Sequence, residues 1–251
     1  MIRSFLIAVG FLTRLPLRLS PDVTEGEIGR AVGFFPLVGA IVGGGGALLY
    51  AGLNPALPHT TSVLIVLIYL AFITGGFHED GLADSLDGLG GGRTKERALE
   101  IMRDSRIGTF GALGLIFLVL VKYNLLSLLE EKQLWRWLIF AHAASRSTSL
   151  LLSLWLPYAR QEGQGKLLAG RIGWRALTVA TATLAAVSFF LPLRVAIFAL
   201  GIVALAVVLS GLYYRRRLNG ITGDCLGATN QITEVALYLC AIVISKTTNV
   251  G

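Results

Sequence analysis

The sequence is poor in charged residues and in cysteine. Only 15% of its 251 residues are Asp, Glu, Lys or Arg, whereas about 25% is usual for a soluble domain. So few charges cannot cover the surface of a soluble protein of this length, which argues against that class. The two cysteines, Cys225 and Cys240, have no metal-binding spacing, and we predict neither a zinc site nor a disulfide from them.

Apolar residues are abundant instead, and they occur in long runs. Hydrophobic residues make up 54% of the chain, and the mean hydropathy is +0.70. Because a helix of about 20 apolar residues crosses the hydrocarbon core, such runs predict transmembrane helices. We therefore expect an all-α, polytopic membrane protein, one helical bundle over residues 1–251 with about seven transmembrane helices. The candidate spans are 31–53, 60–77, 109–129, 134–157, 174–192, 194–213 and 227–245.

The basic residues predict the orientation of these helices, because cytoplasmic loops are enriched in Lys and Arg. With the N-terminus inside, most of them fall in inner loops: Arg3, Arg14, Arg18, Arg30, Arg93, Lys95, Arg97, Arg103, Arg106, Arg160, Lys166, Arg171, Arg175, Arg215, Arg216 and Arg217. Those that fall outside are Lys132, Arg136, Arg194 and Lys246. We therefore expect a multi-pass protein of the cell inner (cytoplasmic) membrane. We attribute the net charge of +7 to its loops and predict no nucleic-acid partner.

The acidic residues gather in one segment, 78–108, which we predict to carry the chemistry at the cytoplasmic face. Asp80, Asp84 and Asp87 are spaced so that they fall within about 60° of one another on a helix. Like charges so placed repel, and they predict a cation against them. Carboxylates without cysteine or clustered histidine suit Mg²⁺, which uses one or two carboxylates together with substrate phosphates. The spacing thus predicts a phosphorylated substrate.

Glycines and arginines follow the aspartates. The glycines between Gly88 and Gly92 end the first helix, and Thr94 is a candidate N-cap for a second helix that runs through Asp104. Arg93 and Arg97 share a face of that helix with Asp104, and arginine side chains match phosphate oxygens. Asp104 is a further candidate metal ligand. The alternative is that 78–108 is a solvated loop with ordinary salt bridges.

Polar residues also occur inside the predicted spans, where they typically face the interior of a bundle. Arg146 is expected either to pair with Glu234, a structural role, or to bind substrate. Lys122 is expected to extend towards the outer surface.

Two further candidate residues are predicted near the acidic segment, on the cytoplasmic side of the membrane. His78 either contacts phosphate, orients a carboxylate or is structural. Asp224, in a glycine-rich loop before the last span, is placed to join the metal site.

Several motifs in the sequence resemble those of a known family. The segments that show the resemblance are 77–88 (FHEDGLADSLDG), 91–94 (GGRT) and 101–109 (IMRDSRIGT), with 11–16, 34–39, 145–146 and 222–228 elsewhere in the chain. They are similar to the cobalamin synthase family, the adenosylcobinamide-GDP ribazoletransferases of the nucleotide-loop pathway. The resemblance implies a Mg²⁺-dependent membrane transferase. Such an enzyme joins adenosylcobinamide-GDP to α-ribazole or its 5′-phosphate, releases GMP and forms adenosylcobalamin or its phosphate.

The resemblance also suggests roles for the residues singled out above. The candidate metal ligands are Asp80, Asp84, Asp87 and Asp104. The candidate catalytic residues are Asp84, Asp87 and Asp104, with Asp84 or Asp87 taking the proton of the ribazole hydroxyl. The candidate substrate-binding residues are His78, Arg93, Arg97, Arg103, Arg106, Arg146 and Asp224. The lipid bilayer is a predicted partner, and so is a second copy of the chain or another enzyme of the pathway.

Two other functions remain open from the sequence. Residues 84–88 resemble the start of the CDP-alcohol phosphotransferase motif, although its later glycine and aspartate spacing is missing, so a phospholipid-type transferase is the second enzyme hypothesis. A transporter is the third hypothesis, because Arg146 and Glu234 lie inside predicted spans. Transporters, however, typically bind near mid-bilayer, whereas these acids gather at the membrane face.

Overall fold

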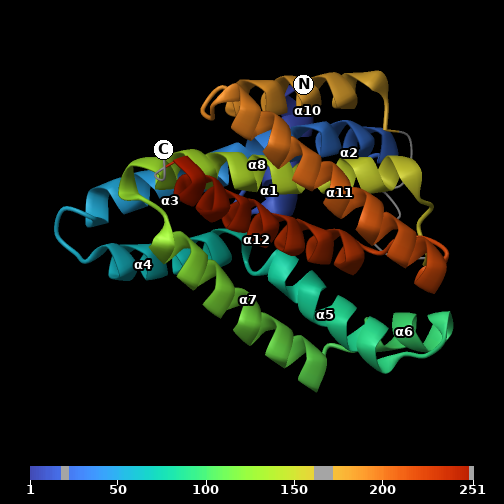
Figure 1. The fold of residues 1–251 in the computed structure, drawn as a ribbon. Helices are drawn as coiled ribbons and strands as arrows, with labels where there is room; N and C mark the ends of the chain where they lie inside the picture. Colours follow the sequence, from blue (N-terminus) through green and yellow to red (C-terminus); the bar gives the residue numbers. More distant parts are fainter. Residues whose placement is uncertain (18–22, 161–171, 249–251) are drawn as a thin grey trace.

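The computed structural model describes residues 1–17, 23–160 and 172–248, and within them every regular element is a helix (Figure 1). The predicted inner-loop residues Arg18, Lys166 and Arg171 lie outside the described residues. The elements are α1 (Ile2–Leu12), α2 (Glu25–Ala31), η1 (Val32–Phe34), α3 (Phe35–Leu53), α4 (His59–Thr74), α5 (Phe77–Gly91), α6 (Lys95–Ile101), α7 (Thr109–Leu128), α8 (Glu131–Trp155), α10 (Trp174–Ser188), α11 (Leu193–Leu218) and α12 (Gly223–Thr248). The all-α prediction is confirmed.

Each predicted span coincides with a helix, but fewer helices are long and apolar enough to cross a membrane. In the described part of the chain four stretches qualify: Gly26–Leu53, Thr109–Leu128, Leu193–Leu218 and Gly223–Ser245. A fifth requires α4 and α5 to be taken together. The 15-residue α10 is about 22 Å long, shorter than the roughly 30 Å hydrocarbon core. The structure thus supports a multi-pass helical membrane protein, and the count of seven stays a prediction.

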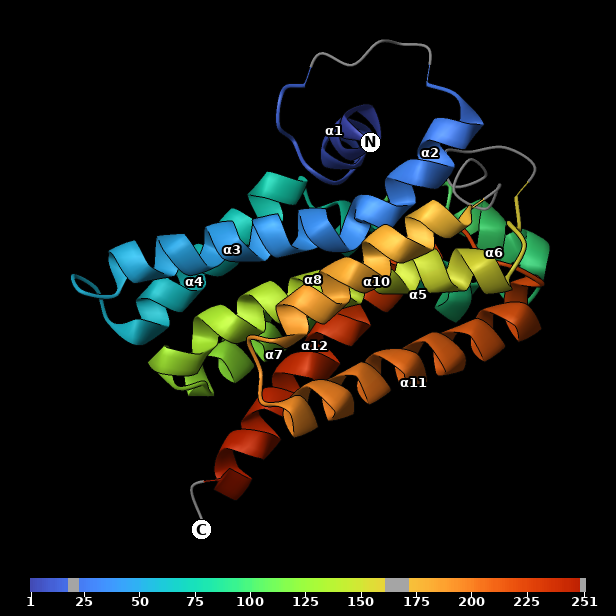
Figure 2. The same cartoon turned by 90° about the horizontal axis from the view of Figure 1, so that it is seen from above.

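α8 is buried throughout its polar middle, which packs against α3 and α12. In the view from above, α3, α8, α10 and α11 run in similar directions, whereas α1 is seen end-on (Figure 2). The glycines of the first predicted span explain how closely α3 packs: a Cβ on Gly39 or Gly43 would run into the backbone carbonyl of His142 or Leu138. Small residues of this kind allow close helix contact in membranes.

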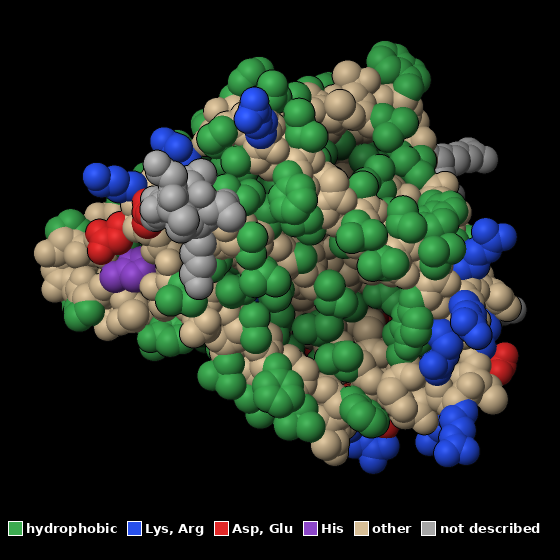
Figure 3. Space-filling model, viewed as in Figure 1, with side chains coloured by type: hydrophobic (Ala, Val, Ile, Leu, Met, Phe, Trp, Pro, Cys, Tyr) green, Lys and Arg blue, Asp and Glu red, His purple; other side chains and the backbone are tan. Residues whose placement is uncertain are grey.

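The outer surface fits a lipid environment. Many large apolar side chains are exposed, among them Phe117 (60%), Leu205 (56%) and Phe72 (77%). Apolar side chains cover the middle of the face in Figure 3, and basic side chains lie towards its margins. Since a water-soluble monomer rarely exposes so large an apolar area, the surface supports the membrane assignment independently of the helix lengths.

A sharp turn sets the position of the acidic segment. Gly75 and Gly76 both have left-handed backbones, with φ of 66° and 67°, which glycine adopts without strain. The chain therefore bends by 84° between α4 and α5. We treat α5, with its four acidic residues, as lying outside the spanning helices, next to α7 and α12 (Figure 1).

Candidate functional site

The site begins where α5 crosses α12. Gly81 and Gly227 face each other there, and a Cβ on either residue would lie 3.3 Å from the Cα of the other. Because the two backbones approach so closely, Asp224 at the start of α12 comes near Asp80 and Asp84 of α5. We call Asp80, Asp84 and Asp224 the acidic cluster. As the sequence predicted, Asp224 thus lies near the first two aspartates of the motif.

The acidic cluster carries uncompensated negative charge. Burial, together with the charges of Asp80 and Asp224, raises the pKa of Asp84 to about 7. The cation that opposes this effect is Arg160, whose Nη2 donates a hydrogen bond of 2.7 Å to Oδ2 of Asp224. The hydroxyl of Thr222 also donates to this oxygen, across 3.3 Å. One arginine against three carboxylates leaves an electrostatic environment that favours a further cation.

The cluster does not form a complete metal cage. Within residues 1–17, 23–160 and 172–248, no three His, Cys, Asp or Glu side chains converge closely enough to hold an ion by themselves. The cluster offers instead one or two carboxylate oxygens. This number fits Mg²⁺, which keeps several waters and binds through one or two carboxylates plus substrate phosphates.

Asp87 lies on the same helix but makes different contacts. Its side chain is buried, and its carboxylate accepts hydrogen bonds from the backbone N–H groups of Gly108 (2.7 Å) and Gly111 (2.9 Å). These amides belong to the first turn of α7, where N–H groups lack partners within the helix and an anion is stabilising. Asp87 therefore fastens the start of α7 to α5. Its predicted metal-binding and catalytic roles stay predictions.

α6 begins as predicted, with the Thr94 hydroxyl accepting a hydrogen bond from the Arg97 N–H across 3.3 Å. Its predicted extent through Asp104 is wrong, because the helix ends at Ile101. Asp104 accepts instead from the N–H of Arg106 at 3.1 Å, a local bond that competes with helical hydrogen bonding.

Two of the four arginines of the acidic segment pair with a nearby acid. Hydrogen bonds from Arg106 lower the pKa of Asp104 to about 2, and Arg97 pairs with Glu100 at 2.7 Å. Arg93 and Arg103 are exposed. None of the four predicted phosphate-binding arginines lines the cavity described next. This part of the segment thus looks like the solvated loop that the sequence left open as an alternative, and substrate binding by these residues stays a prediction.

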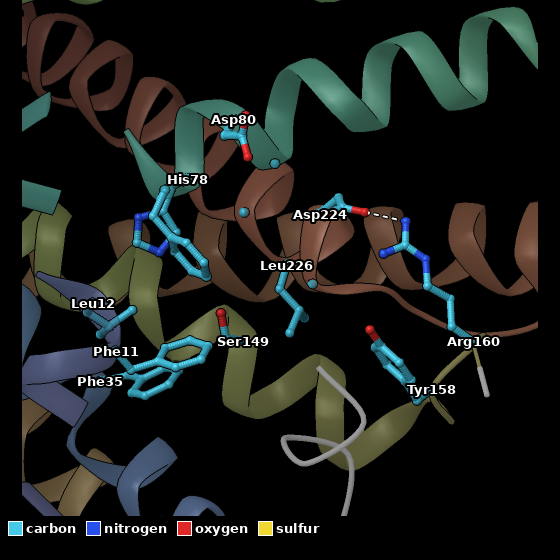
Figure 4. A pocket seen from close by; sticks show the side chains of 14 residues that line it. Phe11, Leu12, Phe35, His78, Asp80, Ser149, Tyr158, Arg160, Asp224 and Leu226 are labelled. Atoms are coloured by element: carbon cyan, nitrogen blue, oxygen red, sulfur yellow. Dashed lines mark hydrogen bonds and ion pairs between the residues drawn. The ribbon is translucent and has the colours of Figure 1, made fainter. Parts of the chain in front are cut away.

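A cavity of about 160 Å³ opens beside the acidic cluster (Figure 4). Asp80, Asp224 and Arg160 lie at one end of it, and aromatic side chains lie at the other. His78, a predicted site residue, is buried and lines the cavity on the side of Phe11 and Phe35 (Figure 4).

Sequence reasoning missed the two cavity residues that follow α8, Tyr158 and Arg160. The backbone places them: Ala159 donates to the carbonyl of Ile221 at 2.8 Å, and Ile221 donates to that of Pro157 at 2.9 Å. This short parallel pairing joins the ends of α8 and α11 beside the start of α12. No spacing in the sequence signals it.

A second polar group lies deeper, between α7, α8 and α12. Glu234 contacts Lys122 at 2.6 Å, His142 at 3.1 Å and Arg146 at 3.4 Å. The predicted pairing of Arg146 with Glu234 is confirmed. The prediction for Lys122 is wrong: its side chain turns inward to Glu234 and Gln231, because a buried carboxylate between helices is a better partner than the distant surface.

The helical bundle with its apolar outer surface, and the acidic cluster beside a cavity, define a polytopic helical membrane protein with a carboxylate-lined site. Comparison of the sequence with known families identifies it further. The profile of the cobalamin-5-phosphate synthase family matches residues 4–242, and the chain belongs to this family.

Curated relatives agree with this assignment. The chain is 41% identical to the adenosylcobinamide-GDP ribazoletransferase of Ralstonia nicotianae, over 93% of this chain and 92% of the relative. It is 41% identical to that of a Polaromonas species, over 95% of both chains, and 35% identical to that of Clostridium botulinum, over 97% and 98%. No solved structure matches the chain. The protein is therefore a transferase of cobalamin synthesis, which favours the first functional hypothesis over a phospholipid-type transferase or a transporter.

Proposed function

We propose that this enzyme transfers adenosylcobinamide phosphate from adenosylcobinamide-GDP to α-ribazole or its 5′-phosphate and releases GMP. A hydroxyl oxygen of the ribazole forms a bond to the phosphorus that bears the cobinamide. The bond from that phosphorus to the oxygen of GMP breaks. The observation that carries the proposal is the acidic cluster beside a cavity, which Asp80, Asp224 and Arg160 line, in a chain of this family.

The residues of the cluster have separate tasks in this reaction. Arg160 binds Asp224 and is available at the cavity to a phosphate oxygen. Asp84, whose pKa of about 7 lies near the pH of the cytoplasm, is suited to accept the proton of the ribazole hydroxyl.

The cluster also supports the proposal that the enzyme requires Mg²⁺. Asp80 and Asp224 would hold the ion together with substrate phosphates, which leaves Asp84 to accept the proton, and the ion would offset the negative charge that develops on the leaving GMP. Asp87 and Asp104 are further candidates from the sequence, although the first is bonded to α7 and the second to Arg106.

The orientation follows from the basic residues. Arg215, Arg216 and Arg217 end α11 at the side of the cluster, and Arg217 donates to the carbonyls of Leu89 and Gly92 at the end of α5. Lys132 lies in the first turn of α8, at the end of that helix away from the acidic cluster. The positive-inside rule therefore favours a cluster that faces the cytoplasm, in the cell inner membrane.

The test is GMP release by the purified full chain in detergent, given adenosylcobinamide-GDP, α-ribazole and Mg²⁺, with and without EDTA. We expect Mg²⁺-dependent turnover that Asp84→Asn reduces by at least about 100-fold, as expected for loss of a general base. Glu100→Gln is the matched control, because Glu100 is an exposed acid of the same segment that pairs with Arg97. Turnover that persists in EDTA would contradict the metal role, and unchanged turnover in Asp84→Asn would contradict the assignment of the cluster.

A further inference from the structure

The cavity beside the acidic cluster changes in character along its length. Its far end is formed by three phenylalanines from three helices: Phe11 of α1, Phe35 of α3 and Phe77 of α5. Phe11 is stacked on Phe35, with ring centroids 5.6 Å apart and 15° between the planes. It meets Phe77 edge-on at 5.2 Å and 75°. We call these three rings the aromatic end; Phe11 and Phe35 are labelled in Figure 4.

The three rings differ in burial. Phe35 is 3% exposed, and the adjoining Leu12 is 1% exposed. Phe77, in contrast, is 38% exposed and borders the cavity next to His78. Ordinary core packing explains why Phe35 and Leu12 are buried. It does not explain why aromatic rings line an accessible cavity close to three carboxylates.

The chemistry of the aromatic end indicates which part of a substrate binds there. Aromatic faces bind flat rings by stacking and edge contacts. The polar side chains close to the aromatic end are few, Ser149 and His78. Guanine carries hydrogen-bonding groups around its edge, and burying them without partners is unfavourable. The base of ribazole is a fused, flat heteroaromatic ring with little hydrogen-bonding capacity, and it loses little on burial. The corrin ring is far larger than the cavity.

We propose that the aromatic end binds the base of the ribazole acceptor. The ribose then extends past His78 towards the acidic cluster, where its hydroxyl meets the diphosphate. Phe11, Phe35 and Phe77 are thus the residues that determine acceptor specificity. The inference rests on the proposed function for the identity of the acceptor, and it adds where that acceptor sits.

The test measures binding and turnover separately. Labelled α-ribazole is titrated against the full chain in detergent by equilibrium dialysis, without the second substrate, and KM is measured for each substrate in the turnover assay. We expect Phe35→Leu and Phe77→Leu each to weaken ribazole binding and raise its KM about five- to tenfold, the loss of one aromatic contact. The KM for adenosylcobinamide-GDP should stay unchanged.

The matched control is Phe34→Leu, because Phe34 is the buried neighbour of Phe35, packs edge-on against Phe5 and does not line the cavity. It should bind ribazole like the unaltered protein. Phe77→Leu, at a partly exposed position, provides a folded variant if the buried Phe35→Leu does not fold.

The outcomes separate this inference from the proposed function. Unchanged ribazole binding in folded Phe77→Leu, or a raised KM for adenosylcobinamide-GDP alone, would overturn the inference; the second result would assign the aromatic end to guanine. If the unaltered protein releases no GMP but binds ribazole, and Phe77→Leu weakens that binding, the reaction is wrong and the subsite stands. If GMP is released with unaltered ribazole KM in both variants, the reaction stands and the subsite is wrong.

Discussion

Lys122 of α7 donates a hydrogen bond of 2.6 Å to Glu234 of α12 in the interior of the bundle. Both side chains are buried, and Glu234 also meets Arg146 and His142 of α8. One carboxylate of α12 thus joins α7 and α8, two consecutive helices, to a helix that is remote from both in sequence. A charge buried in such a place is tolerated only with its partners, which makes the contact a requirement of the fold.

Removing Glu234 should therefore destabilise the protein more than removing one of its partners. Glu234→Gln leaves Lys122 and Arg146 buried without a counter-charge, at a cost of about 3–5 kcal/mol. Lys122→Met leaves Glu234 with Arg146 and should cost less. Thermal unfolding in detergent, with the exposed Lys132→Met as control, should rank the Tm values in that order. Equal Tm values for Glu234→Gln and the unaltered protein would refute a structural role.

The crossing of α5 and α12 predicts a variant that loses activity without losing helix. Gly227→Ala places a Cβ 3.2–3.3 Å from the backbone of His78 and Gly81, so the two helices must separate slightly. Displacement of reacting groups by about 1 Å can cost about 100-fold in rate. We expect GMP release to fall by that order with unchanged helical circular dichroism. Gly201→Ala on α11 is the control, since its Cβ would meet nothing within 4 Å; similar rates in both variants would show that the close approach is dispensable.

Substitutions of Asp84 and Asp87 should have opposite effects on stability. At pH above about 7 the charged form of Asp84 is unfavourable in the folded state, because burial and like charges raise its pKa above the unfolded value. Asp84→Asn should then keep or raise Tm while turnover is lost. Asp87→Asn removes one of two acceptors at the start of α7 and should lower stability by about 1–2 kcal/mol. Unfolding scans and GMP release on the same preparations give both readouts, and the reverse pattern would contradict the division of roles.

Arg160 should affect the charged substrate more than the acceptor. Arg160→Met removes the cation that binds Asp224 and faces the cavity. We expect the KM for adenosylcobinamide-GDP to rise about tenfold, the loss of one hydrogen bond to a charged group. Arg175→Met is the control, because Arg175 is exposed beside Trp174. A changed ribazole KM with no effect on the diphosphate substrate would place Arg160 elsewhere in the reaction.

The sequence by itself determined the class of the fold and the helix that carries the acids. Hydropathy identifies apolar helices because each must satisfy its own backbone hydrogen bonds in lipid. The period of the helix places Asp80, Asp84 and Asp87 on one element, α5, and the local preference of threonine places the start of α6 at Thr94. These are properties of neighbours in the chain, and local rules suffice for them.

The tertiary structure alone decided what those residues touch. Arg160 joins the cluster because its neighbour Ala159 pairs with the backbone of Ile221, Asp87 turns to the amides of α7, and Lys122 turns inward to Glu234. Each contact joins segments remote in sequence, and each depends on how closely two helices pack, as Gly81 and Gly227 show. A charged side chain takes the nearest partner that the packed helices present, and no pattern along one helix contains that information.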